Sequence, residues 1–111
     1  TSPGVLAVRV DQSIYFVNTR YIENFLLSEI SDSPDVKHIV LICTATNFID
    51  TSGLELLERL CDNLNEVGIT LHLAEVKSPV MDKLRKTDFY DHMRGEVYFT
   101  TDIAMKDLSG N

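Results

Sequence analysis

The sequence predicts an α/β fold in which helices pack on a mixed central sheet. Segments of strand length that are rich in Val, Ile and Leu alternate with segments whose apolar residues recur at helical spacing. Residues 38–44 form the densest apolar stretch and lack polar alternation, which is typical of a strand covered on both faces. Pro34 and Gly68 each stand where a helical segment gives way to the next strand. These observations indicate one domain over residues 1–111.

The predicted elements occur in the order β-β-α-β-α-β-α-β-α. Residues 5–10 and 14–17 have the composition of strands, and the turn residues at 11–13 between them predict a hairpin. This hairpin would be the antiparallel part of the mixed sheet. The first helix follows it, with Asn18 or Thr19 available as its cap.

Strands and helices alternate after the hairpin, which predicts right-handed β-α-β crossovers. The helix that begins near Gly53 has an apolar face opposite an acidic face. Thr101 or Asp102 is expected to cap the last helix. The remaining predicted ranges are a strand at 38–44, a helix at 53–67, a strand at 70–76, a helix at 79–87 and a strand at 97–99, and residues 109–111 are expected to fray.

The charge and hydropathy of the chain disfavour two classes of partner. The formal net charge is −7, whereas nucleic-acid binding needs clustered Lys and Arg, so we expect no nucleic-acid partner. The same charge opposes docking on an anionic membrane surface. The longest purely apolar run, residues 39–43, is far shorter than the roughly 20 residues of a membrane span. We therefore expect a soluble chain that does not itself insert into a membrane.

Several conspicuous side chains have simple structural interpretations. Cys43 and Cys61 lie in apolar surroundings and are expected to be buried free thiols, as suits a reducing cytoplasm. The three His residues show no metal-ligand spacing with them, so no metal site is predicted. His72 is expected to be a surface or structural residue. The aromatic residues expected in the core are Tyr15, Phe16, Tyr21 and Phe25. The basic residues Lys83, Arg85 and Lys86 are expected on a solvated helix face.

The tetrapeptide Asp50-Thr51-Ser52-Gly53 is the candidate site. It connects the most apolar strand to an amphipathic helix, and sites in α/β folds gather at such connections, beside helix N-termini. One interpretation is structural, since Ser52 and Glu55 have the S-x-x-E spacing of a capping box. The other is phosphorylation of Thr51, which a helix N-terminus would tolerate and which would add charge beside Asp50 to repel a docked partner. The two interpretations are compatible.

An enzymatic function is a third hypothesis that has only the Asp50 loop to support it, and no enzyme is predicted. Asp50 has no His or second carboxylate placed as an acid–base partner, and Ser52 lacks the G-x-S-x-G setting of a hydrolase nucleophile. Neither a P-loop nor a G-x-G-x-x-G fingerprint is present, so no cofactor is predicted.

With the element order and this loop in hand, the chain resembles the STAS domains shared by bacterial anti-sigma-factor antagonists and SulP anion transporters. The resemblance covers residues 3–108. The family's loop before its second helix has Asp, then Ser or Thr, a second small hydroxyl residue and Gly, which here is Asp50 to Gly53. In the antagonists the residue directly after the Asp is phosphorylated by a partner kinase, and the resemblance assigns this position to Thr51, where Ser is commoner in the family.

The transporter branch of the family resembles this chain more closely at its start. Residues 3–6, 9–11 and especially Ile14-Tyr15-Phe16-Val17-Asn18 look like the SulP pattern, and the Gly-Glu/Asp-Leu-Asp turn of antagonists is absent. Residues 83–89 look like the family's third helix and its exit, although Asp88 stands where Gly is common.

The resemblance implies a non-catalytic regulatory domain of a sulfate-type anion transporter, on the cytoplasmic side of the inner membrane. Its expected partners are the transporter's membrane domain, cytoplasmic proteins or a second copy of the chain. Some family members are proposed to bind nucleotides, but no phosphate loop supports this here. The alternative that it leaves open is a free-standing anti-sigma factor antagonist, switched by phosphorylation of Thr51.

Overall fold

Four strands form a parallel sheet in the order β1-β2-β3-β4 within the part of the chain that the structure describes. This computed structural model describes residues 4–14 and 18–109. The strands are β1 (Val5–Arg9), β2 (His38–Ile42), β3 (Thr70–Ala74) and β4 (Val97–Tyr98). Because all four are parallel, their carboxyl ends share one edge of the sheet.

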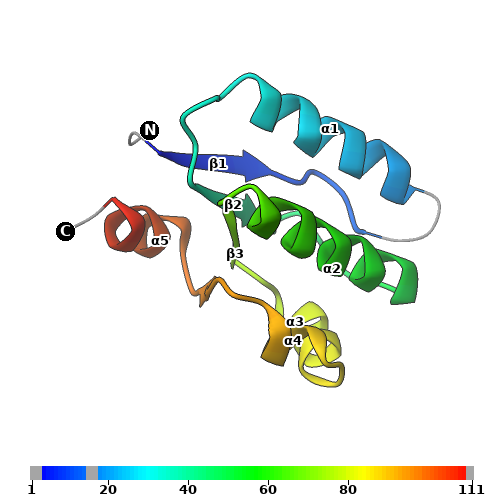
Figure 1. Cartoon of the computed structure of the whole chain (residues 1–111). Helices are drawn as coiled ribbons and strands as arrows, with labels where there is room; N and C mark the ends of the chain where they lie inside the picture. Colours follow the sequence, from blue (N-terminus) through cyan, green and yellow to red (C-terminus); the bar gives the residue numbers. More distant parts are fainter. Residues whose placement is uncertain (1–3, 15–17, 110–111) are drawn as a thin grey trace.

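The helices cover the two faces of the sheet unequally. Residues of the first four helices join the larger hydrophobic cluster on one face, whereas the last helix packs on the other through Ala104, which meets Val5, Val40 and Ala74. Figure 1 shows the first two helices side by side, with the last helix at a distance from them. The helices are α1 (Thr19–Ser31), α2 (Thr51–Glu66), α3 (Ser78–Arg85), α4 (Phe89–His92) and α5 (Thr101–Leu108).

β2 is an inner strand of the sheet, as its composition predicts. Ile39, Val40 and Leu41 are each at most 1% exposed, because they face the larger cluster and α5 alternately. Gly68 ends the α2 region with φ of 82°, in the left-handed conformation expected of a helix-terminating glycine. The strand-helix alternation after residue 18 is therefore correctly predicted.

The described strands do not form the predicted mixed sheet, because all four are parallel. Ile14 forms a parallel bridge with Ile49 instead of turning back on β1, and β1 pairs in parallel with β2. The reason is that residues 12 and 13 make hydrogen bonds to the connection after β2, so the segment at 11–13 crosses to that connection and does not close a tight turn. The rest of the predicted second strand, residues 15–17, lies outside the described residues.

The structure also differs from the prediction in the cap of α5 and in one short helix. Thr100, and not Thr101 or Asp102, caps α5, because its Oγ1 accepts a hydrogen bond from the Ile103 amide at 3.1 Å. The short helix α4 was not predicted.

Two aromatic residues of α1 are also placed differently from the prediction. Tyr21 is 65% and Phe25 39% exposed, whereas Ile22 and Leu26, each about 100° further round the helix, are buried. The predictions for Tyr15 and Phe16 fall outside the described residues.

Candidate functional site

Asp50 begins the candidate site by capping α2. Its backbone is extended, with φ of −103° and ψ of −176°, and its Oδ1 accepts a hydrogen bond from the Gly53 amide at 2.9 Å. The helix therefore begins at Thr51, and the cap is the carboxylate two residues before Ser52. The predicted capping box of Ser52 and Glu55 is wrong, because Ser52 already lies inside the first turn.

Gly53 is the residue that lets α2 start against the segment at Ile14. A Cβ atom at this position would lie 2.5 Å from the backbone oxygen of Ile14 and 2.6 Å from Cγ1 of Ile49. Such distances are well inside van der Waals contact, so any larger residue would push the helix away from the sheet. The Gly of the tetrapeptide thus has a packing role.

Hydrogen bonds fix the loop before Asp50 to the loop after β1. The Asp50 amide donates to the Ile14 oxygen at 3.2 Å, and the Ile14 amide donates to the Phe48 oxygen at 3.1 Å. Ser13 Oγ accepts from the amides of Asn47 and Phe48, at 3.0 and 3.2 Å. These bonds form a frame between residues 12–14 and 46–50. No local pattern in the sequence indicates this frame, because its partners are more than 30 residues apart in the chain.

Thr46 completes this frame from inside. Its side chain is fully buried, and its Oγ1 donates to the backbone oxygen of Gln12 at 3.2 Å. The two loops therefore form one hydrogen-bonded unit at the carboxyl edge of the sheet. In Figure 1 the β1 arrow points toward the end of the molecule where α1 begins.

The site offers groups to solvent from this fixed frame. Thr51 is exposed, Asp50 and Ser52 are half-buried, and Gly53 is buried. Phe48, two residues before Asp50, is 50% exposed. The structure thus presents a hydroxyl, a carboxylate and an aromatic ring near one another in the chain. The sequence alone does not indicate Phe48, because an apolar residue in a loop carries no distinct signal.

The thiols of Cys43 and Cys61 are un-ionised at neutral pH. Burial raises the pKa of the Cys43 thiol to about 12, and burial together with Asp62 and Glu58 raises the pKa of Cys61 to about 12. Cys43 is buried as predicted, whereas Cys61 is half-buried. In the described part of the chain no three His, Cys, Asp or Glu side chains are grouped to hold a metal. Among the described helices none has both the length and the apolar character of a membrane span.

Residues 1–104 match the family model of the STAS domain. The chain belongs to the STAS domain family. It is 32% identical over 108 residues to Sulfate transporter 1.3 of Arabidopsis thaliana, in an alignment that covers 89% of this chain and 16% of the transporter. The chain therefore spans about a sixth of that relative's length. The expected resemblance to the STAS domains of SulP sulfate transporters is confirmed.

Solved structures show the same fold at lower identity. The murine anion transporter Slc26a9 in its inward-facing state aligns with a TM-score of 0.89 and 18% identity, over 98% of this STAS domain and 18% of that chain. The anti-sigma factor antagonist SpoIIAA in its unphosphorylated form aligns with a TM-score of 0.71 and 18% identity, over 100% and 94% of the two chains. The fold is therefore common to proteins of both kinds, and it does not separate the two expected functions.

Proposed function

We propose that this STAS domain is a non-catalytic regulatory domain of a SulP-type sulfate transporter, on the cytoplasmic side of the membrane. The supporting observation is its 32% identity to a plant sulfate transporter along 89% of its length. A domain that spans a sixth of such a protein would act on the remainder through contacts. We propose that the contact surface includes Asp50, Thr51, Ser52 and Phe48, and that its partner is the transporter's membrane domain or a cytoplasmic protein.

The geometry of the loop supports docking more than catalysis. The Asp50 carboxylate is engaged with the Gly53 amide and holds the helix start, so its first role is structural. The exposed groups stand on a hydrogen-bonded frame, and a preorganised surface loses little conformational entropy when a partner binds. Phe48 supplies an apolar group of the kind that anchors interfaces.

The coding sequence upstream of Thr1 gives the first test. We expect several apolar segments of spanning length in the same reading frame. A start codon within a few residues of Thr1 would contradict the proposal.

Binding to the separately expressed upstream region gives the second test. Phe48→Ser is expected to weaken binding of this domain by about fivefold or more, because interface anchors cost over 1 kcal/mol when truncated. Val67→Ser is the matched control, since Val67 is 69% exposed at the opposite end of α2. Equal binding by the parent and Phe48→Ser would remove the loop from the interface.

A second candidate function is a free-standing anti-sigma factor antagonist that is switched at Thr51. The observation that favours it is the exposed Thr51 hydroxyl at the first position of α2, directly after Asp50. SpoIIAA, which shares the fold, has been solved in a phosphorylated form. A kinase-dependent mass gain that Thr51→Ala abolishes would favour this function, whereas an unchanged gain in Thr51→Ala would exclude the switch.

A further inference from the structure

A hollow of about 540 Å³ lies at the carboxyl ends of β2, β3 and β4, apart from the tetrapeptide Asp50 to Gly53. One wall comes from α3 and α4, and the other from the connection between β4 and α5. Its volume is in the range of pockets that hold small organic molecules, roughly 300–1,000 Å³. The carboxyl edge of a parallel sheet is also where ligands of α/β folds bind.

Two cations line this hollow in a chain that carries a net charge of −7. Lys77 Nζ donates to the neutral amide oxygen of Asn47 at 2.7 Å, and the Arg85 guanidinium lies 5.8 Å from the centre of the Tyr90 ring. The ion pairs among the described residues involve other cations, namely Arg9, Arg59 and Lys106. Within the described chain, neither Lys77 nor Arg85 forms an ion pair with a carboxylate at 4.0 Å or less.

The carboxylate that lines the hollow, Glu75, binds Thr101 at the start of α5. Its Oε2 accepts hydrogen bonds from the amide and the hydroxyl of Thr101, at 3.0 and 2.9 Å, and these bonds lower the pKa of Glu75. Glu75 has φ of 60°, the only positive φ among the described non-glycine residues, and its amide donates to the Tyr98 oxygen. In this unusual backbone conformation, the Glu75 carboxylate binds the first residue of α5. It forms no ion pair with Lys77 or Arg85 in the described chain.

The rest of the lining is apolar or aromatic. Met81 and Val97 are half-buried and join the larger core, while Tyr90 and Phe99 remain 38% and 87% exposed. Phe99 is the most exposed of the large hydrophobic residues in the described chain. A hollow with cations and flat rings matches a ligand that has an acidic group and a flat apolar body.

We propose that this hollow binds a small organic anion that has one acidic group, such as a carboxylate or sulfonate, on an aromatic or other flat apolar body. Arg85 and Lys77 pair with the acidic group, and Tyr90 and Phe99 cover the body. Because the hollow is open, we expect affinities in the micromolar to low millimolar range. The proposal does not depend on the protein to which the domain is attached.

The test is a titration of the chain with 2-naphthoate, followed by calorimetry and by backbone amide NMR shifts. Saturable binding is expected, with the largest shifts near Tyr90 and at residues 97–100. Two further ligands separate charge from apolar contact, namely 2-naphthalenemethanol, which lacks the charge, and sulfate, which lacks the apolar body. Both are expected to bind at least about tenfold more weakly, because each loses one of the two kinds of contact.

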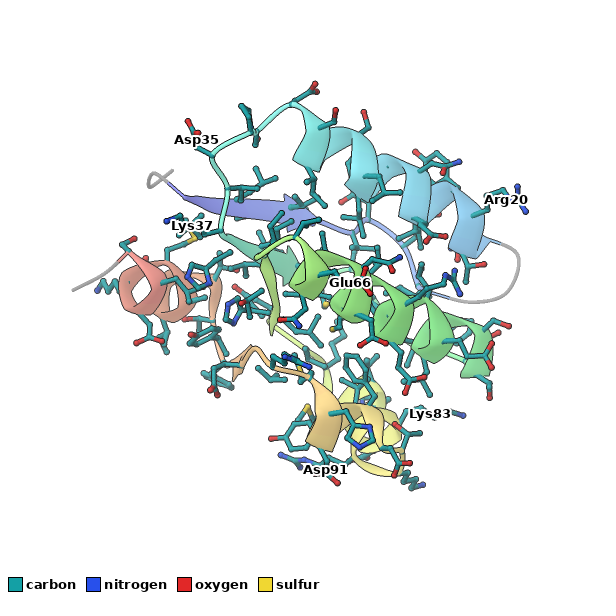
Figure 2. All side chains as sticks on the ribbon, viewed as in Figure 1. Arg20, Asp35, Lys37, Glu66, Lys83 and Asp91 are labelled. Carbon is teal, nitrogen blue, oxygen red and sulfur yellow. The ribbon has the colours of Figure 1, made fainter. Side chains whose placement is uncertain are left out.

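Variants assign the charge contacts. Arg85→Gln and Lys77→Gln are each expected to weaken 2-naphthoate binding by about fivefold or more, since charge-assisted hydrogen bonds are lost. Both residues are exposed, so the fold should survive, and a thermal melt checks this. Lys83→Gln is the matched control, because Lys83 lies on α3 but outside the lining (Figure 2).

Three results would overturn the proposal. The first is binding that does not saturate, and the second is equal affinity for 2-naphthalenemethanol or sulfate. The third is an equal loss of affinity in Lys83→Gln, which would show only the effect of net charge.

Discussion

His38 on β2 and His72 on β3 share a hydrogen bond of 3.1 Å between Nδ1 of His38 and Nε2 of His72. His72 Nδ1 also accepts from the backbone amide of Glu96 at 3.0 Å, so the proton of the neutral His72 ring lies on Nε2 and is donated to His38. His72 is 4% exposed, and its ring centre lies 5.8 Å from that of Tyr98, whose hydroxyl donates to Asp107 of α5. His72 is thus a buried ring that bridges β2, β3 and the Glu96 amide. Of the two expected placements, on the surface or as a structural residue, the first is wrong and the geometry fits the second.

Acid is expected to destabilise the domain through His72. Burial, and then the nearby His38, lower the pKa of His72 from 6.5 to about 4, although Asp107 opposes this. Because the folded pKa is the lower one, the unfolded chain binds this proton first. The stability that neutral His72 contributes is complete above pH 6.5 and is lost between pH 6.5 and 4, by about 3 kcal/mol at most.

Urea unfolding of the parent and of His72→Asn at pH 7.5 and 4.5 measures this contribution. Asn keeps an acceptor for the Glu96 amide but does not titrate, so the variant should be less stable at pH 7.5 and should lose less stability on acidification. Parallel losses in both proteins would show that other groups control the acid response.

Replacement of Gly53 by Ala should destabilise the domain by about 1–3 kcal/mol, the usual cost of forcing extra atoms into a packed site. The added Cβ would meet the Ile14 oxygen, which is backbone and cannot swing away. Thr51→Ala is the control in the same turn, because Thr51 is exposed and its loss should change stability by less than about 0.5 kcal/mol. Thermal unfolding of the three proteins checks both values, and a Gly53→Ala melt equal to that of the parent would refute the close contact.

The role of Asp50 as a cap predicts a graded series. Asp50→Ala should cost about 1 kcal/mol of unfolding free energy, because the Gly53 amide loses its acceptor, whereas Asp50→Asn should retain most of the stability. Denaturant unfolding measures the two differences. If Asn were as costly as Ala, charge rather than the cap would be the main contribution of Asp50.

The main elements of the fold could be predicted because their signals are local. The apolar run at 38–44 and the helical period after Gly53 depend only on neighbours in the chain, and β2 and α2 lie where these patterns place them. The direction of the segment at Ile14 could not be predicted in this way. It depends on bonds from residues 12–14 to residues 46–50, and no local pattern records a contact over such a separation.

The candidate site could be predicted only in part from the sequence, for a similar reason. Asp50 and Ser52 both satisfy a capping rule, and only the hydrogen bond from the Gly53 amide to Asp50 Oδ1 shows that the helix begins after Asp50. Arg85 looked like part of a solvated basic face, and it is indeed exposed. Lys77 stands just before the same helix α3, whereas Phe99 follows β4, so only the folded chain places Phe99 with the two cations around one hollow.

A negative charge at Thr51 is expected to separate docking from stability. In Thr51→Asp the new carboxylate lies at the first turn of α2, where the helix dipole favours it, so the unfolding free energy should change by less than about 1 kcal/mol. The same charge beside Asp50 should weaken partner binding if the loop is the docking surface, because like charges then face one partner. Binding to the upstream region, measured for Thr51→Asp and for the uncharged Thr51→Asn, isolates the charge. Equal binding by these two variants would show that a phosphate at Thr51 has no repulsive effect on this partner.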